Sequence, residues 1–173
     1  GPLCKGAGGM PALRILDLAA NNLNSVGGLG RANFPYLEEL DMSHNRLEDV
    51  CDLAPSVDSV QLVRLKVLNL EDNRIKHFDN LHHLTTLTEL NLRHNSLTER
   101  GAVKMIKALR ELVEFDISGE QKGLNFTHEF ILWILEEQMP RLSDQSKEKL
   151  LEMGVGKKSP GNSGMLVDNY LPL

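Results

Sequence analysis

The sequence predicts a right-handed α/β solenoid in which short parallel strands form a concave sheet of about five strands. An eleven-residue phrase, Leu-x-x-Leu-x-Leu/Met-x-x-Asn-x-Leu/Ile, occurs four times, at residues 13–23, 37–47, 65–75 and 87–97. Apolar residues at helical or three-residue spacing follow these phrases, which indicates a helical or irregular convex side and a helical cap at the C-terminal end. Repetition at such a period is typical of stacked repeat architectures.

The first half of each phrase predicts a strand, because side chains alternate between the two faces of a sheet. In the first copy Leu16 and Leu18 point into the core, and Asp17 between them points outward. An asparagine follows where the chain turns away, and its amide carries donors and an acceptor. Stacked asparagines can therefore form a ladder, since an unsatisfied buried group would cost roughly 1–3 kcal/mol. The ladder residues are Asn21, Asn45, Asn73 and Asn95.

A fifth, degenerate copy begins at Leu112 and continues through Phe115 and Ile117, but it has Glu120 at the asparagine position. Successive copies start 24, 28, 22 and 25 residues apart, so insertions fall between phrases and not within them. We therefore predict one strand for each copy, with the fifth strand the least regular.

These phrases resemble the leucine-rich repeat (LRR) family over roughly residues 10–150. Two branches of this family are similar to the sequence. One contains the regulatory LRR subunit of protein phosphatase-1, which shares the 22-residue spacing of the third copy. The other is the LRR domain of nuclear mRNA export receptors, which has irregular repeats, an N-terminal edge adjoining another domain and a helical C-terminal closure. The resemblance implies a solenoid that binds partners on its concave sheet, and it transfers no individual binding residue.

The segments that follow each phrase and lead back to the next strand, here called return segments, differ in their predicted conformation. In the second copy Pro55 precedes a stretch that reads as a helix. In the fourth copy residues 98–109 read as an amphipathic helix opened by Thr98. The third copy has a short, irregular return with apolar residues at a spacing of three: Ile75, Phe78, Leu81 and Leu84.

The cap is predicted as two helices. The first begins at Asn125 or Thr127 and runs through Glu136, and Pro140 ends it. Trp133 is interpreted as cap packing, and the second helix opens at residues 143–144. The run 126–142 resembles the closure of intracellular LRR domains. The apolar side of the first helix consists of Phe130, Ile131, Ile134 and Leu135.

We divide the chain into four parts. Residues 1–9 form a flexible segment that resembles a cloning remnant, residues 126–154 form the cap, and residues 155–173 form a linker with an apolar tail. The tail from Met165 to Leu173 is either a boundary artefact or a segment that docks on this domain or on a neighbouring chain. The repeats occupy residues 10–125, divided as 13–36, 37–64, 65–86, 87–111 and 112–125.

The amino-acid composition narrows the class of protein to which the chain can belong. With 173 residues and 41% hydrophobic content the chain fits one globular domain, and no apolar run is long enough to span a membrane. Cys4 and Cys51 are the only cysteines. Extracellular LRR modules commonly carry clustered cysteines, so we expect a reducing, cytoplasmic or nuclear setting. The net charge of −5, 5% aromatic content and absence of a basic stripe argue against direct nucleic-acid binding by this fragment.

The outward strand positions and the turns that follow them form the candidate binding surface. Eight of its residues are acids and Arg93 is its only fixed cation. Strands stand about 4.8 Å apart, so these carboxylates share one field that attracts a basic partner. The alternative is that they are ordinary solvated positions. The predicted partner-binding residues are Asp17, Glu39, Asp41, His44, Asn69, Glu71, Asp72, Glu89, Asn91, Arg93, His94, Glu114 and Asp116.

His44, Asp72 and His94 fall in one column, which is the most metal-like arrangement in the chain. Metal ligands must converge within about 2.0–2.2 Å of one ion, whereas a ladder spreads the outer two over two strand spacings. We therefore predict neither a metal nor a cofactor. No nucleophile–base pair, phosphate-binding loop or Cys-x-x-Cys motif stands out, so we do not expect an enzyme.

The sequence thus predicts a protein-interaction scaffold or adaptor that binds a basic protein through its acidic concave face. The alternative is an RNA-associated, mRNA-export or ribonucleoprotein-assembly LRR module. In that case the sheet would bind a protein helix, and flanking parts would contact RNA.

Overall fold

The structure is a computed structural model that describes residues 10, 12–26, 29, 34–53, 62–76, 78–97, 99–119 and 128–155. Several predicted features lie outside these residues: the helix after Pro55, the Thr98 and Thr127 caps, Glu120, and the tail from Met165 to Leu173. The division of the chain into four parts stays a prediction.

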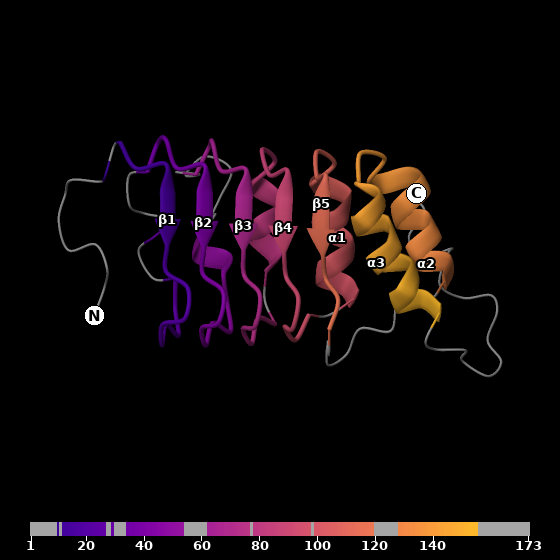
Figure 1. The fold of residues 1–173 in the computed structure, drawn as a ribbon, viewed down its shortest axis with the longest axis horizontal. Coiled ribbons are helices and arrows are strands. Elements are labelled where there is room, and N and C mark those ends of the chain that lie inside the picture. The colour runs from indigo at the N-terminus through magenta and orange to yellow at the C-terminus, as the bar shows by residue number, and fades with distance from the viewer. Residues whose placement is uncertain are drawn as a thin grey trace.

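One sheet of five parallel strands runs through the molecule, and the strands lie in chain order (Figure 1). Neighbouring strands pair without slippage, so residues at equivalent places in the phrase stand side by side. The prediction of one strand for each copy is confirmed. The strands are β1 (Ile15–Asp17), β2 (Glu39–Asp41), β3 (Val67–Asn69), β4 (Glu89–Asn91) and β5 (Glu114–Asp116).

The central residue of each strand faces the core, as the alternation predicts. Leu40, Leu68, Leu90 and Phe115 are buried, whereas Leu16 of β1 is only partly buried. Within the described residues no strand pairs with the outer edge of β1. The first repeat therefore leaves part of its apolar side uncovered by the elements that the structure describes.

The asparagine ladder is present and crosses from each repeat to the one before it. The Asn73 amide nitrogen donates to the carbonyls of Leu70 and Glu71 in its own repeat and of Met42 in the preceding one. Its side-chain oxygen accepts the Leu47 N–H at 3.0 Å. Asn45 and Asn95 repeat this pattern, and all three are buried.

The return segments cover the core side of the sheet in several styles. Two short 3₁₀ helices, η2 (Cys51–Leu53) and η4 (Asp79–His83), follow the second and third copies. The fourth copy returns through α1 (Glu99–Ala108), which confirms the predicted amphipathic helix. Its inner side contains Ala102, Met105 and Ile106, all buried.

The C-terminal cap contains α2 (His128–Trp133), a π-helical turn η5 (Ile134–Gln138) and α3 (Asp144–Val155). The single first helix expected through Glu136 is therefore an α-helix followed by a π turn. Trp133 is 8% exposed and stacks on Phe130 with ring centroids 5.5 Å apart, which agrees with its interpretation as cap packing.

The cap takes the place of a sixth strand. In successive repeats one backbone N–H donates to the carbonyl at the same place in the preceding repeat, as Val113 does to Thr88. Ser143 N–H continues the series by donating to the Val113 carbonyl at 2.8 Å. The N–H of Phe115 in β5, which would otherwise bond a sixth strand, donates to the Ser146 hydroxyl of α3. The chain thus starts a sixth phrase at Leu142 and then turns into a helix.

The fifth copy was expected to be the least regular. Instead β5 pairs in register with β4, and Asp116 makes the same turn bond as its counterparts in the other copies. The regularity extends as far as Gly119 because the cap supplies the donors and acceptors of a following repeat. Ser143 and Ser146 perform this role.

We predict that Asn73→Ala lowers the free energy of unfolding by about 1–3 kcal/mol, since it leaves the buried Leu47 N–H without its acceptor and removes one of the two donors to the Met42 carbonyl. Asn21→Ala is the matched control, because Asn21 is exposed and its side-chain hydrogen bonds to described residues stay within its own repeat. Chemical denaturation measures both. An equal effect of the two substitutions would contradict a cross-repeat role.

Candidate functional site

The predicted outward columns exist as two rows across the sheet. The first row contains Ile15, Glu39, Val67, Glu89 and Glu114, and the second contains Asp17, Asp41, Asn69, Asn91 and Asp116. We call the sheet face that carries these rows and the turns following each strand the concave face. Glu39 and Glu89 are exposed on it, and Ile15 is 60% exposed.

The second row has a structural duty that the sequence analysis missed. In every repeat the side-chain oxygen of this residue accepts the backbone N–H two residues further on, at 2.8–3.1 Å. Asp and Asn make this bond more strongly than Ser or Thr, and the arrangement is an Asx turn. The signal was available, because all five copies carry Asp or Asn at this position.

The column containing His44, Asp72 and His94 is also shaped by the backbone. These three residues and Ala20 have φ between 51° and 54°, in the left-handed region that side chains rarely adopt. The fifth member is glycine, Gly119, at φ 93°. A Cβ on Gly119 would lie 2.4 Å from Nδ1 of His94, so the imidazole of His94 packs directly against this glycine.

Two of the candidate acids are paired with cations on the same face. Nδ1 of His44 lies 2.9 Å from Asp72, and the hydrogen bond to Asp72 raises the pKa of His44. Glu71 lies 3.8 Å from Arg93 and accepts a 3.0 Å bond from Asn91. With His44 paired to Asp72 and His94 packed on Gly119, the three do not converge. No group in the described residues could hold a metal ion.

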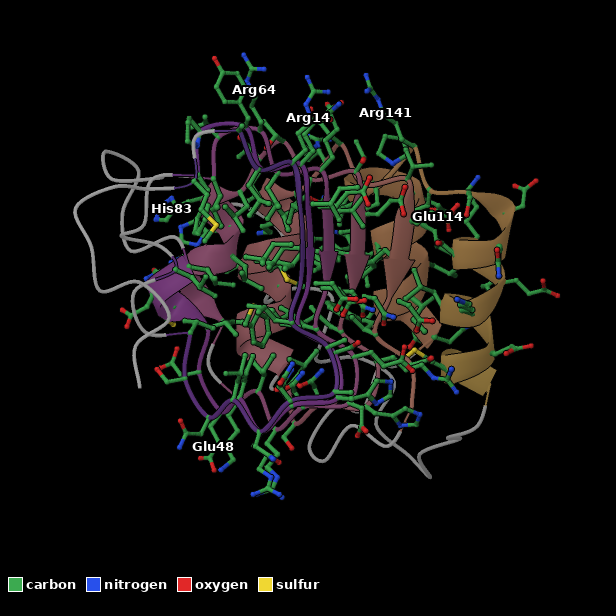
Figure 2. All side chains as sticks on the ribbon, turned by 60° about the vertical axis from the view of Figure 1, so that its left-hand side comes forward. Arg14, Glu48, Arg64, His83, Glu114 and Arg141 are labelled. Atoms are coloured by element: carbon green, nitrogen blue, oxygen red, sulfur yellow. The ribbon has the colours of Figure 1, made fainter. Side chains whose placement is uncertain are left out.

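The C-terminal end of the face is occupied by the cap. Glu114 accepts hydrogen bonds from the hydroxyls of Ser143 and Ser146, and Lys149 donates to Asp116 at 2.7 Å. Figure 2 shows Glu114 between the sheet and the cap. The expectation that Arg93 is the only fixed cation of the face is therefore wrong. Lys149 is far away in the sequence and reaches the face only because α3 packs on β5.

Asp116 and Asp41 lie in different repeats but have similar electrostatic environments. Burial raises the pKa of Asp116, but the hydrogen bonds from Lys149 and Ser118 outweigh it and hold this pKa below its ordinary value. Asp41 behaves similarly: burial opposes ionisation, whereas the bonds from Ser43 and Asn69 lower its pKa overall. Both carboxylates are therefore stable anions that already have hydrogen-bond donors.

Glu39 and Glu89 differ from the other acids of the face. Both are exposed, and within the described residues neither side chain makes an ion pair or a hydrogen bond. Asp17 is also exposed and without an ion pair there, but its carboxylate accepts the Ala19 N–H. Val67 lies between them in the first row. Glu89 and Val67 also line a hollow of about 270 Å³ that is bounded by β3, β4, β5 and the Lys149 side of α3.

Two family profiles match the chain. The profile described as "Leucine Rich repeats (2 copies)" covers residues 11–55, and that described as "Leucine Rich repeat" covers residues 83–105. The chain therefore contains leucine-rich repeats, and the parallel sheet with its helical returns is an LRR solenoid. The likeness to the phosphatase-1 regulatory type and to mRNA export receptors stays a prediction.

Curated relatives match over about half of this chain. A calmodulin-binding receptor kinase of Arabidopsis thaliana, CaMRLK, is 40% identical over 85 residues, which cover 49% of this chain and 13% of the kinase. Tubulin-specific chaperone E of Dictyostelium discoideum is 32% identical over 103 residues, which cover 51% of this chain and 19% of the chaperone. The chain thus spans less than a fifth of either relative.

Solved structures share the fold. An internalin (inlF) of Listeria monocytogenes superposes with a TM-score of 0.55 at 20% identity, covering 82% of this chain and 33% of the internalin. The LRR ectodomain of the receptor kinase SOBIR1 of Arabidopsis thaliana gives 0.50 at 21% identity, covering 73% and 65%. In the part of this chain that the structure describes, no helix is long and apolar enough to cross a membrane.

We predict that the pKa of His44 lies above its ordinary value of 6.5 and that Asp72→Asn lowers it, because the carboxylate stabilises the imidazolium. A raised folded-state pKa contributes stability below pH 6.5, and this contribution disappears as the pH rises through the folded value. NMR titration of the His44 ring checks the shift, with Asp52→Asn as the control. The same pKa in wild type and Asp72→Asn would contradict the pairing.

We predict that Lys149→Met lowers the free energy of unfolding at neutral pH by about 1 kcal/mol, a value reduced for partial exposure. Because the folded pKa of Asp116 lies below its ordinary 3.8, the contact contributes stability above about pH 3.8 and loses it as the pH falls through the folded value. The variant should therefore show a weaker loss of stability on acidification. Lys147→Met, whose partner Asp144 is fully exposed, is the control.

Proposed function

We propose that this LRR solenoid binds a protein partner that presents Lys or Arg, through the concave face centred on Glu39 and Glu89. LRR domains generally mediate protein–protein interaction, and this fold has the same open parallel sheet. The observation that carries the proposal is that Glu39 and Glu89 are exposed and, among the described residues, make neither an ion pair nor a side-chain hydrogen bond. The remaining acids of the face are engaged with His44, Arg93, Lys149, the hydroxyls of Ser143 and Ser146, or backbone donors.

The electrostatics favour a basic partner. Eight acids stand on the face, whereas the fixed cations bonded to them are Arg93 and Lys149. Glu39 and Glu89 are separated by one intervening strand, or about 10 Å at the usual strand spacing. That distance is similar to the Debye length at physiological salt, so both act on one approaching cation cluster. Charge complementarity of this kind increases the association rate and selects the partner.

The first row also offers apolar surface between its charges. Ile15 precedes Glu39, and Val67 separates Glu39 from Glu89. A partner whose cations alternate with small apolar side chains would therefore bury carbon against Ile15 and Val67 while it neutralises both carboxylates. Burial of apolar area contributes about 25 cal/mol per Å², and the ion pairs then determine orientation.

The names of the relatives do not identify the partner of this chain. CaMRLK is described as calmodulin-binding and chaperone E as tubulin-specific, but this chain covers only 13% and 19% of those proteins. We propose the cytoplasm or the nucleus as its compartment, a proposal supported by the scarcity of cysteines.

The experiment compares wild type with Glu39→Lys/Glu89→Lys as immobilised baits and identifies the retained proteins by mass spectrometry. We predict that the partner is basic, elutes as salt rises and binds the variant at least about tenfold more weakly, which corresponds to 1.4 kcal/mol. Asp41 and Asn91 are left unchanged, because their side chains hold the Ser43 and Arg93 N–H groups and their replacement would disturb the fold.

Glu48→Lys/Glu136→Lys is the matched control, since it makes the same change in net charge at exposed residues away from the first row. Figure 2 shows Glu48 at the sheet margin opposite Arg14 and Arg64. Equal retention by the two variants would show that net charge alone matters. Undiminished binding by the concave variant would move the interaction to another surface.

A further inference from the structure

The margin of the sheet at which the strands begin carries a different charge from the concave face. One row along this margin is aligned by cross-repeat hydrogen bonds and consists of Arg14, Glu38, Lys66, Thr88, Val113 and Ser143. The turns just before it supply Tyr36, Arg64, Arg110, Glu111 and Arg141. Figure 2 shows Arg14, Arg64 and Arg141 projecting from this same margin. We call it the basic margin.

Cations outnumber carboxylates on the basic margin. The five cations are Arg14, Lys66, Arg64, Arg110 and Arg141, and the two carboxylates are Glu38 and Glu111. The excess is local, because the whole chain has a net charge of −5.

Both carboxylates are already neutralised. Lys66 lies 3.2 Å from Glu38 and Arg14 lies 3.8 Å from it, while Arg141 pairs with Glu111. The hydrogen bond and charge of Lys66, followed by the charges of Arg14 and Arg64, hold the pKa of Glu38 below its ordinary value. Lys66, Arg14 and Arg64 therefore lie close to one another, and all three interact with the Glu38 carboxylate.

Arg64 and Arg110 have neutral partners. The Arg64 guanidinium lies 4.7 Å from the centroid of the Tyr36 ring, and Arg110 donates to the Glu137 carbonyl at 3.2 Å. Both residues are exposed. Their charges are therefore held in position by contacts that leave them available for an anion.

A hollow of about 530 Å³ lies in the middle of the basic margin. The charged residues that line it are Arg64, Lys66, Glu38 and Glu111, and Val63, which is 53% exposed, lines it too. The hydroxyls of Thr86 and Thr88 line it too, but they are bonded to the carbonyls of Leu65 and Lys66. The two carboxylates of the lining are also paired with Arg14 and Arg141, so the positive excess comes from the cations around the hollow, and the hollow adds carbon surface.

We propose that the basic margin is a second interaction surface, which binds an acidic segment of another protein in which Asp or Glu alternates with small apolar residues. Arg64, Lys66 and Arg110 pair with the carboxylates, and Val63 contacts the apolar residues. This surface is distinct from the concave face, so one solenoid would hold a basic and an acidic partner side by side.

A protein segment fits the basic margin better than a nucleic acid does. The Tyr36 ring already carries the Arg64 guanidinium over its face, whereas single-stranded nucleic acids bind by stacking bases on open aromatic rings. Val63 and Val113 add exposed carbon, which a phosphate backbone does not match. The acidic concave face next to the margin would also repel a long polyanion.

The experiment measures binding of a fluorescein-labelled peptide, in which glutamate alternates with alanine, to the full chain by fluorescence anisotropy. Wild type should bind it, and affinity should fall as salt rises. Arg64→Glu/Arg110→Glu should weaken binding at least about tenfold, and Arg64→Gln/Arg110→Gln should weaken it by an intermediate factor. Circular dichroism melting confirms that each variant is folded.

Lys76→Glu/Lys104→Glu is the matched control, since it changes net charge equally at exposed residues of the opposite margin and of α1. It should keep wild-type affinity. Equal weakening by both reversals, or no binding of the peptide by wild type, would overturn the proposal. Tighter binding of single-stranded oligouridylate than of the peptide, lost in Arg64→Glu/Arg110→Glu, would replace the acidic segment by a nucleic acid.

Discussion

Each buried asparagine of the ladder joins two neighbouring repeats, and the rest of the solenoid depends on that link. Asn73 connects its own turn to the carbonyl of Met42 and the N–H of Leu47, so the turn after one strand is completed by the next repeat. A short strand of three residues contributes few hydrogen bonds by itself. The ladder keeps successive strands in register, and this register creates the rows of the concave face.

The two ends of the sheet differ because a parallel sheet leaves unpaired backbone groups at each edge. At the C-terminal end Ser143 N–H and the Ser146 hydroxyl bond the edge of β5, and Lys149 binds Asp116. The cap therefore satisfies the edge of β5 in place of a sixth strand. The same contacts occupy Glu114 and Asp116, which are then not available to a partner. At the β1 end Leu16 and Leu18 are only partly buried. Among the described residues they pack against the core on one side, and no further element covers the other.

Charge is segregated between two surfaces that meet along the sheet. The concave face is acidic and retains Glu39 and Glu89 without an ion pair in the described part of the chain, while the basic margin gathers Arg64, Lys66 and Arg110. Repetition explains how this arises. Each position of the phrase becomes a row across the sheet, so the acids at the outward strand positions gather on one face, while cations at the strand beginnings and in the turns before them gather along one margin.

The sequence by itself determined the strands, their order and their facing, because a short-range phrase with alternating apolar residues and an asparagine turn specifies each repeat locally. It also placed Glu39 and Glu89 correctly on the open face. It did not reveal that Asp41 and Asn91 support the turns. Nor did it show that Met139-Pro140-Arg141-Leu142 repeats the turn that starts each phrase and ends in a helix instead of a strand. Only the tertiary structure decided which acids are engaged and which are free, because Lys149 reaches Asp116, and Ser143 reaches Glu114, across 33 and 29 residues of chain.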